Sequence, residues 1–308
     1  MHWDKKGLVY CPNGQGFFKT HATRPIAYRL DNEKVRLFFS SRDSDDRMLP
    51  TFIDVEAANP SRVLRICDRP LVELGRPGTF DDSGVTVGCV VDFDDCVIIY
   101  YTGWKRRRVV SFELSIGMLC WDRNNDTFSR RFDGPIISQD PSHPLQVAGP
   151  FVMFDEGRYK MWYCSGTDWK FPDSRPEPLY TVFYAESSDG IKWEPRGRAI
   201  NYRFDGEVVS APWVLKHDGK YLMWYSFRGH DTKEAKNYTI GFAESNDGLH
   251  WERRDEAVGI SHSKTGWDSE MICYPTFYTH AGEIYMIYSG NGVGRAGIGY
   301  AVAENFLT

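Results

Sequence analysis

The chain has 308 residues, a formal net charge of −5, 42% hydrophobic and 15% aromatic residues, and 28 glycines. This charge excludes a general attraction to nucleic acid or to anionic membranes. No run approaches the roughly 20 apolar residues that cross a bilayer, and the first residues lack the apolar region of a signal peptide. We therefore expect a cytoplasmic protein with neither nucleic-acid nor membrane partners.

Many short, aromatic-rich strands are indicated by the composition and by a repeat along the chain. Aromatic and aliphatic residues alternate with the period of two of a half-buried strand in five segments, which are 35–41, 97–103, 159–166, 221–227 and 284–290. A period of roughly 50 to 65 residues is typical of propeller blades. The turns at Asp189-Gly190 and Asp247-Gly248 then join the third strand of a repeat to a short fourth strand.

The last repeat ends without a fourth strand, and residues 2–10 resemble the missing one. Trp3 is followed by an acid and a basic pair, much as Trp193 and Trp251 are followed by an acid and a basic residue. Pairing of the N-terminal segment with the final blade would remove exposed sheet edges. We predict an all-β fold, a five-bladed β-propeller closed by that pairing, as one domain over 1–308 with blades at about 17–66, 80–132, 145–196, 204–254 and 267–305 plus 2–10.

The seven cysteines form no C-x-x-C pair, and several lie inside apolar strand patterns. Free, buried thiols in a reducing compartment are therefore expected. A metal needs three or four converging ligands, whereas His21 and His143 lie in no ligand-spacing motif. We expect no metal and no cofactor.

The innermost strand of each blade lines the centre of a propeller, so its start is the place for a site. Alignment of these strands places the following residues at one level: Arg24, Val87, Gly149, Ala211 and Tyr274. It places Glu207 and Glu270 at another level on neighbouring blades, with Asp82 nearby in register. Paired carboxylates are what glycosidic bond cleavage needs, so these three acids are the catalytic candidates.

A structural alternative stays open for these acids, because acids at the starts of blades also cap turns. Asp81, Asp205 and Asp268 recur after an aromatic residue, which favours structural turn acids that accept backbone N–H bonds.

Substrate-binding candidates lie near the same central end. His21 and His143 precede inner strands, and Trp104, Trp169 and Arg228 follow second strands. Aromatic faces stack on sugar rings and arginine binds carboxylates or phosphates, although both tryptophans could equally pack between blades. The basic run 105–108 is interpreted as a solvated hairpin loop, with an anion-binding patch as the alternative.

The repeated A-E-S-x-D-G-x-x-W motifs at 185–193 and 243–251, with Y-Y-T-G at 100–103 and M-W-Y-C-S-G at 161–166, give a family resemblance. The whole chain resembles the five-bladed glycosidase-like superfamily that includes glycoside hydrolase families 32, 43, 68 and 130. The resemblance implies that the two Asp-Pro positions of family 43 correspond to Arg24 and Gly149, and its acid Glu to Ser210, so the family 43 triad is not preserved. Arg24 and Ser210 are therefore among the predicted ligand contacts, and the inner-strand alignment adds Tyr274.

The sequence predicts two alternative functions from different classes, and it leaves a third one possible. The first is a glycoside hydrolase-like protein that acts on a glycan or glycosylated metabolite through Glu207, Glu270 and Asp82. In the second, a non-hydrolytic carbohydrate-binding or sugar-pathway propeller holds an anionic sugar through Arg24 and Arg228, since an arginine in place of an acid reverses the local charge. A protein-interaction scaffold is the third. The sequence does not determine the oligomeric state.

Overall fold

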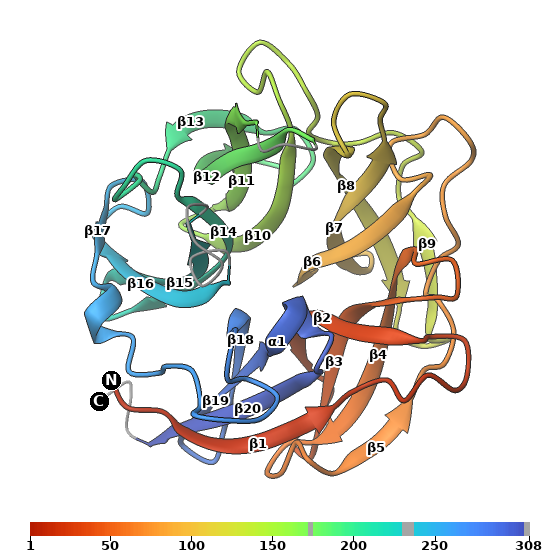
Figure 1. The fold of residues 1–308 in the computed structure, drawn as a ribbon, viewed down its shortest axis with the longest axis vertical. Helices are drawn as coiled ribbons and strands as arrows, with labels where there is room; N and C mark the ends of the chain where they lie inside the picture. The colour runs from red at the N-terminus through yellow and green to blue at the C-terminus, as the bar shows by residue number, and fades with distance from the viewer. Residues whose placement is uncertain (172–174, 230–236, 305–308) are drawn as a thin grey trace.

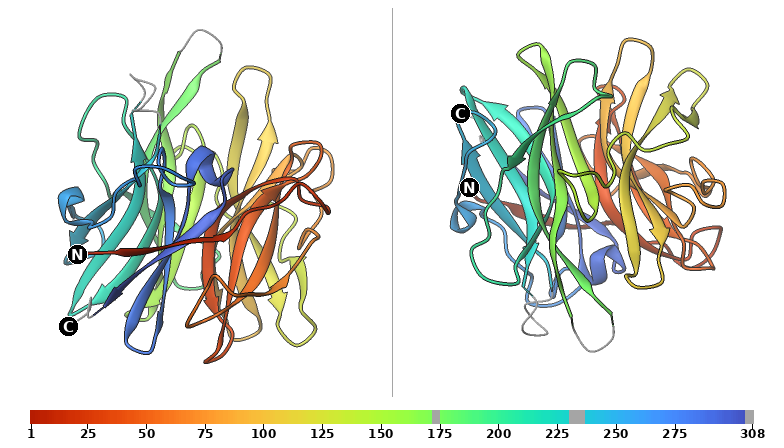
Figure 2. Two further views of the ribbon diagram at one scale, coloured as in Figure 1. Left: turned by 60° about the horizontal axis from the view of Figure 1, so that its bottom comes forward. Right: turned by 90° about the horizontal axis from the view of Figure 1, so that it is seen from above.

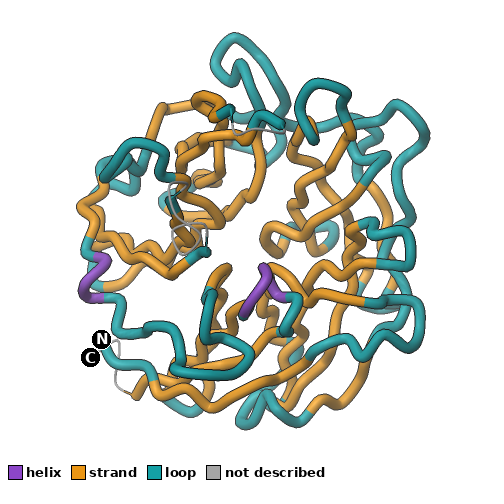
Figure 3. Tube along the Cα trace, in the orientation of Figure 1, coloured by secondary structure: helices purple, strands orange, loops and turns teal. Residues whose placement is uncertain are grey.

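The computed structural model describes residues 1–171, 175–229 and 237–304, and these form an all-β fold. Twenty strands account for nearly all of the regular structure in these ranges, as the orange tube of Figure 3 shows. The helical segments in this part of the chain are the one-turn η1 (Asp255–Ala257) and the short α1 (Asn291–Gly294). The expectation of little or no helix is confirmed.

The first half of the chain forms an eight-stranded sheet that consists of two antiparallel groups of four strands. A single parallel pair, Met48 with Gly84, joins the two groups. The first group contains β2 (Thr20–Arg29), β3 (Lys34–Arg42), β4 (Met48–Glu56) and β5 (Val63–Ile66). The second contains β6 (Gly84–Asp92), β7 (Val97–Arg106), β8 (Phe112–Asp122) and β9 (Thr127–Arg130).

The rest of the chain forms three separate four-stranded antiparallel sheets. One contains β10 (Val147–Asp155), β11 (Arg158–Lys170), β12 (Glu177–Ser187) and β13 (Glu194–Arg198). The next contains β14 (Val208–His217), β15 (Lys220–Arg228), β16 (Thr239–Ser245) and β17 (Trp251–Arg253). The last contains β18 (Cys273–His280), β19 (Glu283–Ser289), β20 (Ile298–Glu304) and β1 (Asp4–Tyr10). The groups surround a central axis, with β2, β6, β10, β14 and β18 nearest to it (Figure 1).

The N-terminal strand β1 pairs antiparallel with β20, as predicted, and runs beside it in Figure 1. Lys5 pairs with Ala301, just as Arg253 of the preceding sheet pairs with Ala243. This register makes Trp3 the counterpart of Trp251, which confirms the predicted equivalence. The Trp3 indole is buried against Phe277, and its Nε1 donates to the carbonyl of Val258 at 3.0 Å.

Neighbouring groups of strands are joined near the axis by a repeated contact. A main-chain N–H of each innermost strand meets a small side chain on the second strand of the group before it. The five contacts are Val87 N–Ser40 Oγ (3.1 Å), Gly149 N–Thr102 Oγ1 (2.9 Å), Ala211 with the Cys164 thiol, Tyr274 N–Ser226 Oγ (2.8 Å) and Arg24 N–Ser289 Oγ (3.1 Å). The sequence alignment of these inner positions is thereby confirmed.

The backbone conformation at these inner positions explains why the main-chain N–H donates to a neighbouring group rather than to a strand of its own sheet. Arg24, Gly149, Ala211 and Tyr274 have positive φ between 50° and 62°, and each directly precedes a proline. At each, the pairing with the second strand shifts register. A left-handed conformation costs a non-glycine residue roughly 1–2 kcal/mol, so the neighbour's hydroxyl or thiol offsets part of this cost by accepting the amide.

Two cysteines differ from the expectation that all are free. Cys96 and Cys120 form a disulfide, because the pairing of Val97 with Trp121 brings their Cα atoms to 6.0 Å. The other cysteines are free, and Cys89, Cys164 and Cys273 are buried as expected.

None of the helices in the described ranges is long and apolar enough to cross a membrane. The cytoplasmic location stays a prediction, to which a disulfide adds no support, since disulfides are rare in reducing compartments.

Substitution Trp3→Ala should lower the free energy of unfolding by about 3 to 5 kcal/mol, because it empties a buried position between β1 and the core. Leu8→Ala, in the strand β1 that follows Trp3, is the matched control, since Leu8 is 42% exposed, and it should change stability by under about 0.5 kcal/mol. Urea denaturation of both variants measures the difference. Equal effects would mean that β1 is an appendage without a structural role.

Candidate functional site

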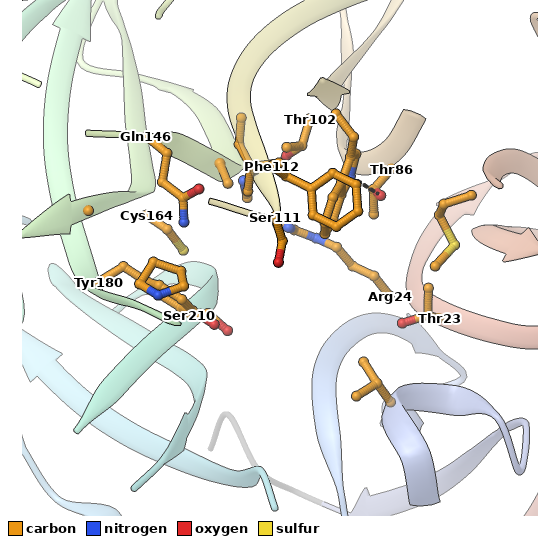
Figure 4. A pocket seen from close by; sticks show the side chains of 18 of the residues that line it. Thr23, Arg24, Thr86, Thr102, Ser111, Phe112, Gln146, Cys164, Tyr180 and Ser210 are labelled. Carbon is orange, nitrogen blue, oxygen red and sulfur yellow. Dashed lines mark hydrogen bonds between the residues drawn. The ribbon is translucent and has the colours of Figure 1, made fainter. Parts of the chain in front are cut away.

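A cavity of about 430 Å³ lies at the centre of the molecule, where the inner ends of the strand groups meet (Figure 4). Every group contributes residues at or near its inner strand to the wall, and the first three groups also contribute residues of their second and third strands. The loop before β8 and helix α1 complete it. Its polar and charged lining residues include His21, Thr23, Arg24, Arg42, Thr86, Thr102, Ser111, Gln146, Glu177, Tyr180, Ser210 and Tyr274. A volume of this size suits one small polar molecule.

The Arg24 side chain extends from β2 into this cavity, and Gln146, Cys164 and Ser210 lie on the opposite side in Figure 4. Arg24 is 9% exposed, and its Nη2 donates to the carbonyl of Pro150 at 3.5 Å. Burial lowers the pKa of its guanidinium, which nevertheless stays charged as arginine does in proteins. No carboxylate among the described residues lies within ion-pairing distance. A buried cation without a counter-ion costs several kcal/mol, so the cavity favours an anion.

Two further polar atoms on the wall lack hydrogen-bond partners within the described part of the chain. These are Ser210 Oγ and Arg42 Nε, both buried. Buried polar atoms in native proteins are nearly always satisfied by protein, water or ligand. Because both atoms line the cavity that Arg24 enters, they indicate acceptor and donor groups in whatever fills it.

His21 is a neutral hydrogen-bonding group on the same wall. Burial, with a contribution from the nearby Arg42 guanidinium, lowers the pKa of its imidazole to about 4. Nδ1 contacts Thr20 Oγ1 at 2.9 Å, which leaves Nε2 for the cavity. His21 lies in the left-handed region with φ 65°, and backbone strain of this kind clusters at functional sites.

Glu207, predicted as a catalytic acid, does not line the cavity. Its carboxylate is buried and accepts two bonds of 2.8 Å from the Arg253 guanidinium and one of 2.7 Å from the Arg203 amide. Asp81 is similarly paired with Arg130 at 2.7 Å, and Asp268 with Lys5 at 2.6 Å. Glu207 therefore has the structural role of these acids, tying the start of an inner strand to a fourth strand.

The other two catalytic candidates also lie outside the cavity wall. Glu270 is exposed, and its main-chain N–H donates to Asn291 Oδ1. Asp82 is a turn acid that accepts from the Gly78 amide at 2.9 Å and from the Ser83 hydroxyl at 2.6 Å. The structure thus does not bring the three acids together. Within the described wall the single carboxylate is Glu177.

The structural role expected for the repeated aspartates needs correction in its details. Asp81 and Asp268 accept from the hydroxyls of Tyr101 and Tyr288 at 2.9 Å and from basic side chains, rather than from backbone amides. Although burial opposes it, Lys5 holds the pKa of the Asp268 carboxyl below its usual range. Asp205 is exposed, and Glu207 replaces it in the buried pair.

The predicted binding residues divide into two sets. His21, Arg24, Ser210, Tyr274, Trp104 and Trp169 line the cavity. His143 and Arg228 do not: the His143 imidazole is buried between Asp140 and the Tyr163 hydroxyl, and the Arg228 guanidinium lies 5.3 Å from the centre of the Tyr238 ring. Trp104 lines the cavity, and its Nε1 donates at 2.7 Å to Thr86 Oγ1, which belongs to the same group of strands.

The sequence indicated Arg42 only as the end of a second strand, and it gave no indication of Gln146, Glu177 or Tyr180, which also line the cavity. They lie outside the inner strands, on β3, on β12 or just before β10, where residues differ from repeat to repeat. A repeat alignment detects what the groups share, so it cannot single out such positions. Among the described residues no group of three or more His, Cys, Asp or Glu side chains is placed to hold a metal ion.

Comparison with known proteins gives two curated relatives along the whole chain, whereas no family model matches. They are the uncharacterized proteins Rv1502 and MT1551 from two strains of Mycobacterium tuberculosis. Each is 34% identical over 308 residues, which is 99% of this chain and 100% of the relative.

Solved structures with the same fold are glycoside hydrolase-like propeller proteins. The BT0996–RGII complex has a TM-score of 0.77 at 19% identity, over 98% of this protein and 92% of that one. A glycoside hydrolase has a TM-score of 0.75 at 18% identity, over 97% and 90%. A thermostable family-43 glycoside hydrolase has a TM-score of 0.64 at 14% identity, over 92% and 88%. The superfamily resemblance seen in the sequence is confirmed at the level of the fold.

Glu207→Gln should lower the free energy of unfolding by about 2 to 3 kcal/mol, because it removes the charge that Arg253 binds in a buried pair. Glu270→Gln is the matched control and should change it by under about 0.5 kcal/mol, since Glu270 is exposed. Chemical denaturation of the two variants checks this. A destabilising Glu270→Gln with a neutral Glu207→Gln would reverse the structural assignment.

His21 predicts a pH dependence of stability. Its folded-state pKa of about 4 lies below the ordinary value of 6.5, so the unfolded state binds this proton first as pH falls. The free energy of unfolding should therefore rise between about pH 4 and pH 6.5, by roughly 1 kcal/mol after solvent screening at this half-buried site. Denaturation over this range should show the rise in the wild type and in His2→Gln, an exposed control, but not in His21→Gln. The same rise in His21→Gln would contradict the assignment.

Proposed function

We propose that this protein, which belongs to the same family as the uncharacterized protein Rv1502 of Mycobacterium tuberculosis, binds an anionic sugar in its central cavity. The observation that carries the proposal is the buried Arg24 guanidinium, for which no described residue provides a counter-ion. The ligand class is a sugar that bears a carboxylate or phosphate group. Arginine binds both groups through two parallel N–H bonds.

The remaining wall supports a sugar as the rest of the ligand. Trp104, Trp169 and Tyr274 supply aromatic surface for the apolar face of a sugar ring, while Ser210 and Gln146 supply hydrogen-bonding groups for hydroxyls. A neutral His21 adds a further acceptor or donor. The structural neighbour BT0996, which forms a complex with RGII, adds support for a carbohydrate ligand on this fold.

Binding takes precedence over hydrolysis in this proposal because of the carboxylates. Glycoside hydrolysis by the usual mechanisms needs an acid and a second carboxylate on either side of the scissile bond. Glu177 is the one carboxylate on the described wall, and Glu207 is committed to Arg253. The three positions that the resemblance assigns to catalytic acids hold Arg24, Gly149 and Ser210, all of which line the cavity.

The five-bladed, closed architecture is part of the same proposal. We take residues 1–308 as a single propeller domain with the blade boundaries expected from the repeat. The five inter-group contacts near the axis, including the one between Arg24 and Ser289, support five blades in a ring. Pairing of β1 with β20 supports closure of the last blade by the N-terminal strand.

Titration calorimetry with D-galacturonic acid, galactose 1-phosphate and neutral galactose tests the proposal and distinguishes the two sources of charge. At least one acid should bind more tightly than galactose. Arg24→Ala should weaken that binding by about 10- to 100-fold, because it removes a charge-assisted pair worth about 1.5 to 3 kcal/mol. Arg76→Ala, at an exposed arginine, is the control and should bind as the wild type does.

Ser210→Ala provides a second variant in case Arg24→Ala does not fold. The variant should be as stable as the wild type, since the Ser210 hydroxyl has no partner in the described structure, yet bind the acid about 5-fold more weakly. Thermal denaturation and calorimetry measure the two properties. Equal binding of galactose and both acids, or wild-type affinity in both variants, would exclude an anionic sugar in this cavity.

A further inference from the structure

A second cavity, of about 390 Å³, lies beside the central one. Its wall consists of the loop between β7 and β8, the segment that precedes β10, and Trp169 of β11. The hairpins β7–β8 and β11–β12 extend at the same end of the molecule in Figure 2. The second cavity therefore lies toward the end of the molecule at which these two hairpins extend.

The two cavities are adjacent. Phe112, Gln146 and Trp169 line both of them, so sites in the two cavities would lie next to each other. Two of these residues are aromatic, and an aromatic surface that spans two neighbouring sites suits a chain of sugar rings.

The basic run noted in the sequence supplies the charge of the second cavity. Arg107 is committed to Glu113, to which its Nε donates at 2.6 Å. Arg108 is exposed, lines the cavity, and forms no ion pair with any residue that the structure describes. The adjacent Val109 is 76% exposed and lines the same wall. An arginine on a cavity wall without an ion-pair partner in the described structure is placed to bind an anionic group of a ligand.

We propose that this second cavity binds the next unit of an acidic oligosaccharide whose end unit occupies the central cavity, and that Arg108 binds the charged group of that second unit. This inference rests on the proposed function and extends it, because it assigns the ligand to oligosaccharides with adjacent acidic units rather than to single sugars. Arg24 and Arg108 each bind one acidic unit of the same oligosaccharide.

Galacturonate oligomers of one, two and three units are the probes, measured by calorimetry at 0.15 M salt, where long-range attraction is screened. In the wild type the dimer should bind about 10-fold more tightly than the monomer, and the trimer should gain little more. Arg108→Ala should reduce the gain from monomer to dimer to under about 3-fold and leave monomer binding unchanged. Arg106→Ala is the matched control, since Arg106 is an exposed arginine of the same hairpin that lines neither cavity.

The outcomes separate this inference from the proposed function. Monomer binding that depends on Arg24, with a dimer that binds no more tightly, excludes the second subsite alone. An equal loss in Arg106→Ala and Arg108→Ala also excludes it, because the effect would then come from general charge. If no galacturonate of any length binds, the proposed function fails for uronates and the inference fails with it.

Discussion

The contact between a strained inner residue and the next group of strands is the constraint on which the centre of this molecule depends. A residue before a proline adopts a left-handed conformation, which turns its amide out of its own sheet. The amide then needs a partner, since a buried N–H without one costs about 1 to 3 kcal/mol. A hydroxyl or thiol of the neighbouring group provides it at Arg24, Gly149, Ala211 and Tyr274. Val87, which precedes a glycine, donates to Ser40 in the same way. Packing between groups and the backbone at the cavity are thus determined together.

This arrangement also separates the charges of the protein. Acids at the starts of inner strands are neutralised within their own groups, as Glu207 is by Arg253 and Asp268 by Lys5. The centre instead keeps Arg24, whose main-chain amide is held by Ser289 while its guanidinium reaches into the cavity. These acids are therefore neutralised by basic side chains of outer strands, and the unbalanced charge remains where a ligand can meet it.

Much of the fold could be predicted because the repeated pattern reflects interactions between residues that are close in the sequence. Period-two alternation and Asp-Gly turns are properties of adjacent residues, and the structure contains those strands and turns: Asp189 and Asp247 each accept two main-chain N–H bonds within their own turn. Trp3 could be assigned to a fourth strand since the same short pattern occurs at Trp251. Prediction failed for Cys96 and Cys120, whose approach depends on the exact register of β7 and β8 rather than on sequence spacing.

By itself the sequence determined the strand pattern and the role of the N-terminal strand. It also determined which residues of the five inner strands occupy equivalent positions, because each of these properties follows from short-range periodicity. Only the tertiary structure decided which side chains face the centre. Glu207 and Arg24 both lie near the start of an inner strand, yet one turns toward an outer arginine and the other toward the cavity. That choice depends on partners about 50 to 270 residues away, such as Arg253 for Glu207 and Ser289 for Arg24, which become neighbours only when the strand groups pack around a common axis.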